Sequence, residues 1–151
     1  MRIVLWMALA TCLFLTAPFA MAGPKEDVAA AITKWTEAVS ENSTDKVVAL
    51  YATDAVLWGT SSPTVRADTA AIRAYFEAVF KALPGIKVRL GDQFIRIYGT
   101  TAINTGYYNV TYPKDGETKT LPARYSFTYL KDGENWLIVD HHSSASPAPP
   151  K

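Results

Sequence analysis

Cysteine is almost absent from the 151-residue chain. The only one, Cys12, lies in an apolar N-terminal run, so the remaining residues have neither a disulfide nor thiol chemistry. An excess of charge of one sign is also lacking, because 15 Lys and Arg stand against 14 Asp and Glu, and the sequence has no basic cluster. Binding to nucleic acid or to an anionic membrane requires such a cluster, so we expect neither partner. No repeat, kinase motif or nucleophile-elbow serine is present, which argues against a kinase or a hydrolytic triad.

Long apolar runs are missing except at the N-terminus, where "IVLWMALATCLFLTAPFAMA" follows Met1 and Arg2. A charged start, an apolar stretch and the small residues of Ala20-Met21-Ala22 are typical of a secretory signal peptide. We therefore expect cleavage after Ala22 and export to the periplasm or the medium. A membrane anchor and a lipoprotein based on Cys12 are the competing interpretations. Because Pro18 interrupts the run and no positive stop follows it, we expect no stable anchor.

Residues 23–145 then form one domain, followed by a frayed tail over residues 146–151. Helical periodicity predicts helices in "KEDVAAAITKWTEAVSEN" (25–42), after Thr44, and in "ADTAAIRAYFEAVFKALPG" (67–85). "AVLWG" (55–59) is typical of a short strand. From Ile86 onward, β-branched and aromatic residues predict four antiparallel strands, with hairpin signals in the Asp-Gly pairs at 115–116 and 132–133 and a bulge at Gly91.

This order predicts an α+β fold in which three N-terminal helices pack on a strongly curved antiparallel sheet. A curved sheet closed by helices makes a cone-shaped barrel with an interior pocket, a common place for small-molecule sites.

Three stretches resemble one known family: "YATDAV" (51–56), "RAYFEAVF" (73–80) and "WLIVDHHSS" (136–144), of which the last is the most specific. Together with the order of the elements, they resemble the nuclear transport factor 2-like superfamily of cone-shaped α+β barrels, including its SnoaL-like domains. Within it the chain is most similar to the association domain of calcium/calmodulin-dependent protein kinase II and its free-standing bacterial relatives.

The resemblance implies a homodimer or higher oligomer formed through the sheet, and a pocket between sheet and helices. It implies neither kinase activity nor calmodulin binding, because the calmodulin-binding helix of the animal kinases lies outside the association domain. The kinase hub carries arginines where this chain has Asn109 and Ser143, so an anion site of several arginines is not implied. We predict no cofactor. We also predict no metal, because the adjacent His141 and His142 point to opposite faces of a strand.

Which histidine faces the pocket depends on the last hairpin. If Asp132-Gly133 is a two-residue turn, Arg124 lies opposite His141 on a mixed polar face. The other face is then aromatic. A three-residue loop would instead place Arg124 opposite His142. We assign the mixed face to the pocket and the aromatic face to a partner subunit, because pockets need a few polar groups and subunit contacts favour aromatic area.

On this assignment Arg124 can hold a carboxylate or an enolate-like oxygen, and His141 can transfer a proton near neutral pH. The pair Asp140 and His142 shares one face and is a second candidate for acid–base chemistry, against the alternative of a polar rim. The candidate ligand-binding residues are Arg124, His141, Ser143, Asn109, Tyr51, Trp58, Tyr75, Phe80 and Tyr107.

The leading functional hypothesis is an exported, homo-oligomeric domain that binds a small organic ligand, organic acids included. The first alternative is an acid–base enzyme of the ketosteroid isomerase or polyketide cyclase type that acts on an apolar carbonyl compound, with His141 or Asp140 and His142 as its proton-transfer groups. The second alternative is a purely structural oligomerisation module.

Overall fold

The computed structural model describes residues 23–148, so the predicted signal peptide (1–22) and the last residues of the tail lie outside the described residues. The described chain is built from three helices and five strands, as the α+β prediction requires. They follow in the order α1 (Pro24–Ser40), α2 (Thr44–Val48), β1 (Tyr51–Trp58), α3 (Thr69–Ala82), β2 (Lys87–Tyr98), β3 (Thr101–Lys114), β4 (Glu117–Asp132) and β5 (Asn135–Ala145).

Local sequence signals account for the helix ends. Pro24 occupies the first turn of α1, where its missing N–H costs nothing. The Asp68 carboxylate accepts a hydrogen bond from the backbone N–H of Ala71 at 2.7 Å and caps α3. The helix predicted after Thr44 is α2. It includes Thr44 and is capped by Ser43, whose hydroxyl accepts a hydrogen bond from the N–H of Lys46.

The sheet has the order β1-β5-β4-β3-β2. The predicted antiparallel meander of β2, β3, β4 and β5 is confirmed, and β1 adds a fifth strand parallel to β5. Asp115 and Gly116, with φ of 55° and 78°, form the predicted two-residue turn between β3 and β4. The register of β2 against β3 shifts between Leu90 and Gln93, so the bulge predicted at Gly91 is present.

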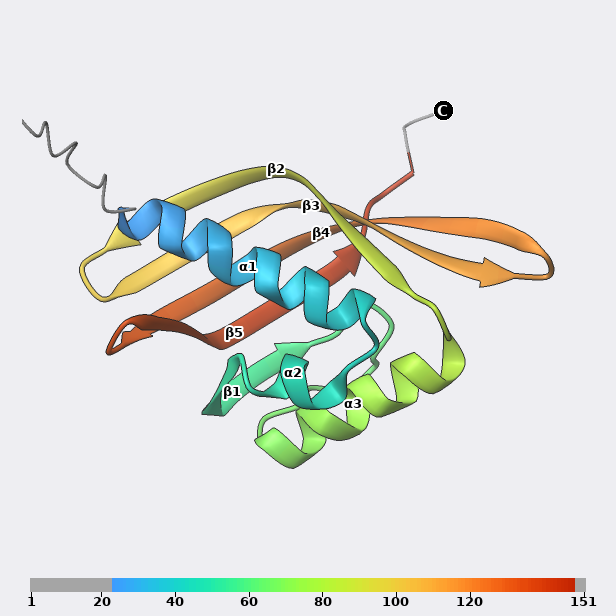
Figure 1. Ribbon diagram of the computed structural model, residues 1–151, viewed down its shortest axis with the longest axis horizontal. Coiled ribbons are helices and arrows are strands. Elements are labelled where there is room, and N and C mark those ends of the chain that lie inside the picture. Colours follow the sequence, from blue (N-terminus) through green and yellow to red (C-terminus); the bar gives the residue numbers. More distant parts are fainter. Residues whose placement is uncertain (1–22, 149–151) are drawn as a thin grey trace, which may run out of the picture.

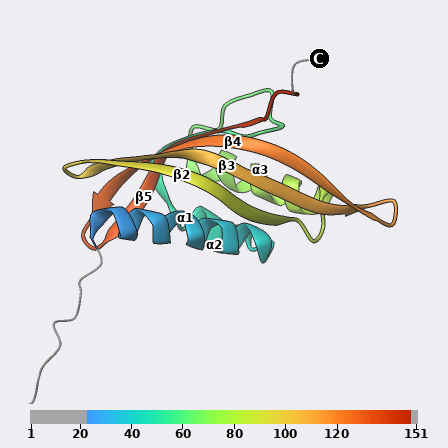
Figure 2. The same ribbon diagram turned by 90° about the horizontal axis from the view of Figure 1, so that it is seen from above.

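Helix α1 crosses one face of the curved sheet (Figure 1), and α2 lies on the same side of the sheet (Figure 2). The apolar stripe of α1, which consists of Val28, Ile32, Trp35 and Val39, is buried against this face, called the inner face below. Each large apolar side chain removed from water in this layer stabilises the fold by about 1.5–3 kcal/mol. No helix in the described part of the chain is long and apolar enough to cross a membrane.

The predicted register of the last hairpin is wrong. Asp132 pairs with Asn135, so the turn lies one residue later than predicted, and a bulge between Ile138 and Asp140 shifts the register again. Beyond the bulge, Phe127 pairs with His141 and Arg124 with Ser144. His141 therefore shares a face with the aromatic side chains, and Arg124 lies on the opposite face.

The aromatic face consequently forms the core of the subunit itself and not a contact with a partner. Tyr125, Phe127, Tyr129 and Trp136 are all buried beneath α1 and its neighbours. The physical reason is the pleat: one extra residue in β5 exchanges the faces of all residues that follow it.

Candidate functional site

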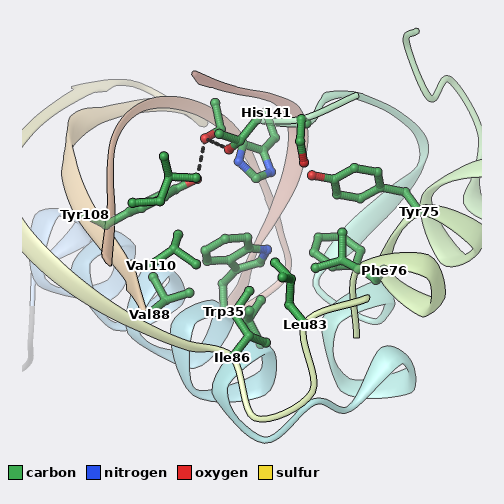
Figure 3. Close-up of a pocket in the computed structure, with 16 residues that line it drawn as sticks. Trp35, Tyr75, Phe76, Leu83, Ile86, Val88, Tyr108, Val110 and His141 are labelled. Atoms are coloured by element: carbon green, nitrogen blue, oxygen red, sulfur yellow. Dashed lines mark hydrogen bonds between the residues drawn. The ribbon is translucent and has the colours of Figure 1, made fainter. Parts of the chain in front are cut away.

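A pocket of about 70 Å³ lies between the helices and the inner face of the sheet. Figure 3 shows its wall side chains converging on the hollow from the helices and the sheet. The lining residues are Trp35, Val39, Gly59, Thr60, Ser61, Tyr75, Phe76, Val79, Leu83, Ile86, Val88, Tyr108, Val110, Leu121, His141 and Ser143. Most of them are apolar, and apart from His141 none of them is ionisable near neutral pH.

One side of the pocket carries a chain of three hydroxyls, drawn with dashed lines in Figure 3. The Tyr108 hydroxyl and the Ser143 Oγ lie 2.5 Å apart, and Thr60 hydrogen-bonds to the same Ser143 oxygen. These groups come from β3, from β5 and from the loop after β1. Burial is the main reason why the pKa of Tyr108 is raised to about 12, so this hydroxyl stays protonated at physiological pH.

His141 supplies the second polar group of the pocket. Its Nδ1 lies 2.7 Å from the hydroxyl of Tyr51, and the oxygen of this hydroxyl accepts a hydrogen bond from Trp35 Nε1 at 3.1 Å. Its Nε2 is buried and has no hydrogen-bond partner among the described residues. Burial, with a smaller contribution from the nearby His142, lowers the pKa of His141 to about 3, so the ring is neutral at physiological pH.

The family model of the SnoaL-like domain matches residues 28–149. The chain belongs to this family. A solved structure from Xanthomonas campestris, a candidate calcium/calmodulin-dependent protein kinase II association domain, is 36% identical, with a TM-score of 0.75 over 87% of this chain and 94% of that one. The resemblance predicted from the sequence is thus confirmed.

The cone fold of this SnoaL-like domain also occurs in more distant structures. A candidate dehydratase of the NTF2-like family from Streptomyces avermitilis is 18% identical, with a TM-score of 0.74 over 82% of this chain and 97% of that one. A candidate scytalone dehydratase from Novosphingobium aromaticivorans is 14% identical, with a TM-score of 0.72 over 80% and 83% of the two chains. At these identities the likeness concerns the fold alone. A comparison with functionally curated proteins finds no match.

Three of the residues predicted for the site of the SnoaL-like domain line the pocket: Tyr75, His141 and Ser143. Two others stand behind its wall. Tyr51 holds His141 from the core side, and Phe80 packs on Phe76 with ring centroids 5.9 Å apart.

The other predicted residues lie on the outer face of the sheet. Arg124 is exposed there and donates from Nε to the Ser144 hydroxyl at 3.1 Å. The assignment of Arg124 to the pocket is therefore wrong. The outer face, which the pocket does not reach, also carries the predicted residues Asn109, Tyr107, Trp58, Asp140 and His142, so their assignment to the site is wrong as well.

Sequence reasoning missed Tyr108, Thr60 and the part played by Trp35. The helical period places Trp35 on the apolar side of α1, but its contact with Tyr51 depends on the strand pairing of β1. Tyr108 follows Tyr107 in β3, and alternation alone could not decide which of these two tyrosines points inward. In β3 the buried residues Ala102, Asn104, Gly106 and Tyr108 occupy every second position, and this alternation identifies the inner face.

Proposed function

We propose that this SnoaL-like domain binds a small, uncharged organic molecule in the pocket lined by Trp35, Tyr75, Tyr108 and His141. The observation that carries the proposal is that His141 lines the pocket while its Nε2 is buried and has no hydrogen-bond partner among the described residues. Buried polar groups are nearly always hydrogen-bonded, and apolar pockets with a few directed polar groups are the usual form of small-molecule sites.

The size of the pocket limits the ligand. A cavity of about 70 Å³ holds roughly five water molecules when one water needs about 10–15 Å³ of such space. A five- or six-membered ring with one polar substituent has a comparable number of non-hydrogen atoms. A larger ligand requires displacement of lining residues.

The lining also limits the charge of the ligand. Within residues 23–148 no lysine, arginine, aspartate or glutamate is among the lining residues. A carboxylate placed here would be buried without a counter-ion, which is strongly unfavourable. Because Arg124 lies on the opposite face, the organic acids included in the first hypothesis lose their support, and an uncharged ligand is favoured.

The alternative of an acid–base enzyme is weakened by the same geometry. Proton abstraction next to a carbonyl requires a base within reach of the substrate. The pair Asp140 and His142 lies on the outer face, and the Nδ1 of His141 already bonds Tyr51. The fold alone does not establish an activity. We therefore propose binding without turnover.

Ligand-observed NMR with a library of small uncharged ring compounds tests this proposal. Val79→Phe places a ring into the pocket, and Val65→Phe makes the same change at a valine that is 39% exposed and outside the lining. We expect hits that Val79→Phe abolishes and Val65→Phe keeps. Hits that survive both substitutions would place the ligand elsewhere on the domain.

We also propose a homodimer formed through the outer face of the sheet. Three large side chains on neighbouring strands are exposed there, namely Phe94 by 59%, Tyr98 by 61% and Tyr107 by 54%. We call these three residues the outer aromatic patch. Exposed aromatic side chains gathered on one face of a sheet are typical of subunit contacts. Because the inner aromatic face is filled by the core, the outer aromatic patch replaces it as the proposed dimer surface.

Export remains the third part of the proposal and rests on the N-terminal sequence alone. A signal peptide cleaved after Ala22 would leave a mature protein that begins at Gly23. Intact-mass measurement of the protein recovered from the periplasm or the medium tests this. A mass that includes residues 1–22 would contradict it.

A further inference from the structure

A relay of two hydrogen bonds ends at the pocket. The indole Nε1–H of Trp35 points at the Tyr51 hydroxyl at 3.1 Å, and this hydroxyl lies 2.7 Å from His141 Nδ1. All three side chains are buried, with exposed fractions of 3%, 7% and 2%. Trp35 and His141 line the pocket, whereas Tyr51 lies behind them.

The positions of the hydrogens follow from what each group can do. An indole N–H can only donate, so the Tyr51 oxygen accepts from Trp35. The hydroxyl of Tyr51 has one proton, for which the only acceptor bonded to it among the described residues is His141 Nδ1. Nδ1 must then be unprotonated. In a neutral imidazole the remaining proton lies on Nε2.

The opposite arrangement costs more. If Nδ1 carried the proton and donated to Tyr51, the Tyr51 proton would have no acceptor and Nε2 would be a bare acceptor. That arrangement leaves two buried polar groups unsatisfied within the described chain instead of one. Each unsatisfied buried group costs about 1–3 kcal/mol.

We infer that Tyr51 and Trp35 fix His141 as the tautomer with its proton on Nε2, so that the pocket presents one directed, uncharged donor and selects ligands with an acceptor atom such as a carbonyl oxygen. The selection of ligands rests on the function proposed above, whereas the tautomer does not. Tyr51 acts here as a positioning residue, because it reaches the ligand only through His141.

Packing keeps the donor aimed at the pocket. The His141 ring stacks on Phe127 with centroids 3.9 Å apart and planes at 21°, and Trp35 contacts it edge-on at 5.2 Å and 90°. In Figure 3 the nitrogen-bearing edge of His141 faces the hollow above Trp35. A flip of the ring would break the bond to Tyr51, so the direction of Nε2–H is fixed by both the stack and the relay.

The hydroxyl chain on the other side of the pocket has no such direction. Thr60, Ser143 and Tyr108 each carry one rotatable proton, so the chain can run either way and can donate to a ligand or accept from it. Selectivity for an acceptor therefore comes from His141 and not from the hydroxyls.

The tautomer can be measured directly by two-dimensional ¹H–¹⁵N NMR of the imidazole ring. The chain has two histidines, so the substitution His142→Gln on the outer face leaves His141 as the only signal. We expect the pattern of a neutral ring protonated at Nε2, and a mixture of tautomers in Tyr51→Phe, which lacks the hydroxyl. If the His141 imidazole is protonated at Nδ1 in the protein that keeps Tyr51, the inference is overturned, even if cyclic compounds bind in the pocket.

The selectivity is tested with cyclopentanone and with methylenecyclopentane, in which a CH₂ group replaces the carbonyl oxygen. We expect His141→Phe, which keeps the aromatic stack, to lower the affinity for cyclopentanone roughly three- to tenfold and to leave the affinity for methylenecyclopentane unchanged. Cyclopentylamine and cyclopentanecarboxylate, both charged, should bind more weakly than the ketone.

Two further results decide between the parts of the proposal. If His141→Phe lowers the affinity for cyclopentanone and for methylenecyclopentane equally, the proposed selectivity is overturned. If none of these compounds binds although Nε2 is protonated, the proposed ligand pocket is overturned together with the selectivity, and the tautomer stands.

Discussion

The two faces of β4 and β5 meet different surroundings although they alternate along the same strands. The inner face carries buried rings and His141, whereas the outer face carries the exposed Arg124 and His142. His141 and His142 are joined by one peptide bond, yet His141 is neutral and enclosed while its neighbour is open to solvent. The bulge before Asp140 decides which of the two histidines is enclosed. Candidate chemistry in this fold therefore depends on the register of one strand.

The largest expected difference between the faces is one of packing. Ile138 on the inner face is 1% exposed, and Leu130 on the outer face is 45% exposed. Ile138→Ala should lower the free energy of unfolding by roughly 2–5 kcal/mol, and Leu130→Ala by about 1 kcal/mol or less, because only the first leaves a cavity. Urea unfolding of both variants measures this. Similar losses would mean that the outer face is as closely packed as the inner one.

The second difference is in the response to pH. The pKa of His141 falls from 6.5 in the unfolded chain to about 3 in the fold, so the unfolded chain binds the extra proton between these values. The buried, neutral His141 therefore does not reduce the free energy of unfolding well above pH 6.5, and it reduces it increasingly as the pH falls from 6.5 toward 3. Between pH 7 and pH 5 the loss from this residue should be about 2 kcal/mol.

The two histidines serve as each other's control for this pH effect. His141→Gln should remove most of the loss between pH 7 and pH 5, and His142→Gln should leave it in place. Urea unfolding at several pH values gives both results. An unchanged pH dependence in His141→Gln would show that His141 is not the group responsible.

A third prediction concerns association through the outer face. Phe94→Asp places a charge in the outer aromatic patch and should raise the dissociation constant of the proposed dimer at least tenfold, about 1.4 kcal/mol. Thr118→Asp makes the same change on an exposed residue near the β3–β4 turn, outside this patch, and should have little effect. Analytical ultracentrifugation distinguishes these results. A wild-type protein that stays monomeric at high concentration would contradict the dimer.

The elements that the sequence predicts well are those with local causes. The stripes of α1 and α3 follow the helical period, and Asp115-Gly116 supplies the positive φ values that a two-residue turn needs. The fold class follows from the order of such elements. None of these inferences requires knowledge of how distant residues pair.

The candidate site is harder to predict because it depends on pairing over a distance. Because the last turn lies one residue later than predicted, each residue of β4 pairs with a residue two positions further along β5. A shift of two positions leaves every side chain on its predicted face. The bulge at Val139 adds one residue to a single strand and exchanges the faces of Asp140 and His141. Val139 lies in an uninterrupted β-type run, with neither glycine nor proline beside it to indicate a bulge.

The smallest expected effect concerns the residue that sequence reasoning placed at the centre of the site. Arg124 donates one hydrogen bond to Ser144 from an exposed position, and exposed contacts of this kind contribute little. Arg124→Ala should change the free energy of unfolding by about 0.5 kcal/mol or less and leave the affinity for cyclopentanone unchanged, because the side chain and the pocket lie on opposite faces of the sheet. NMR titration of the variant measures the affinity. A loss as large as that of His141→Phe would mean that the ligand binds on the outer face, and the pairing of His141 with Phe127 would then have no bearing on recognition.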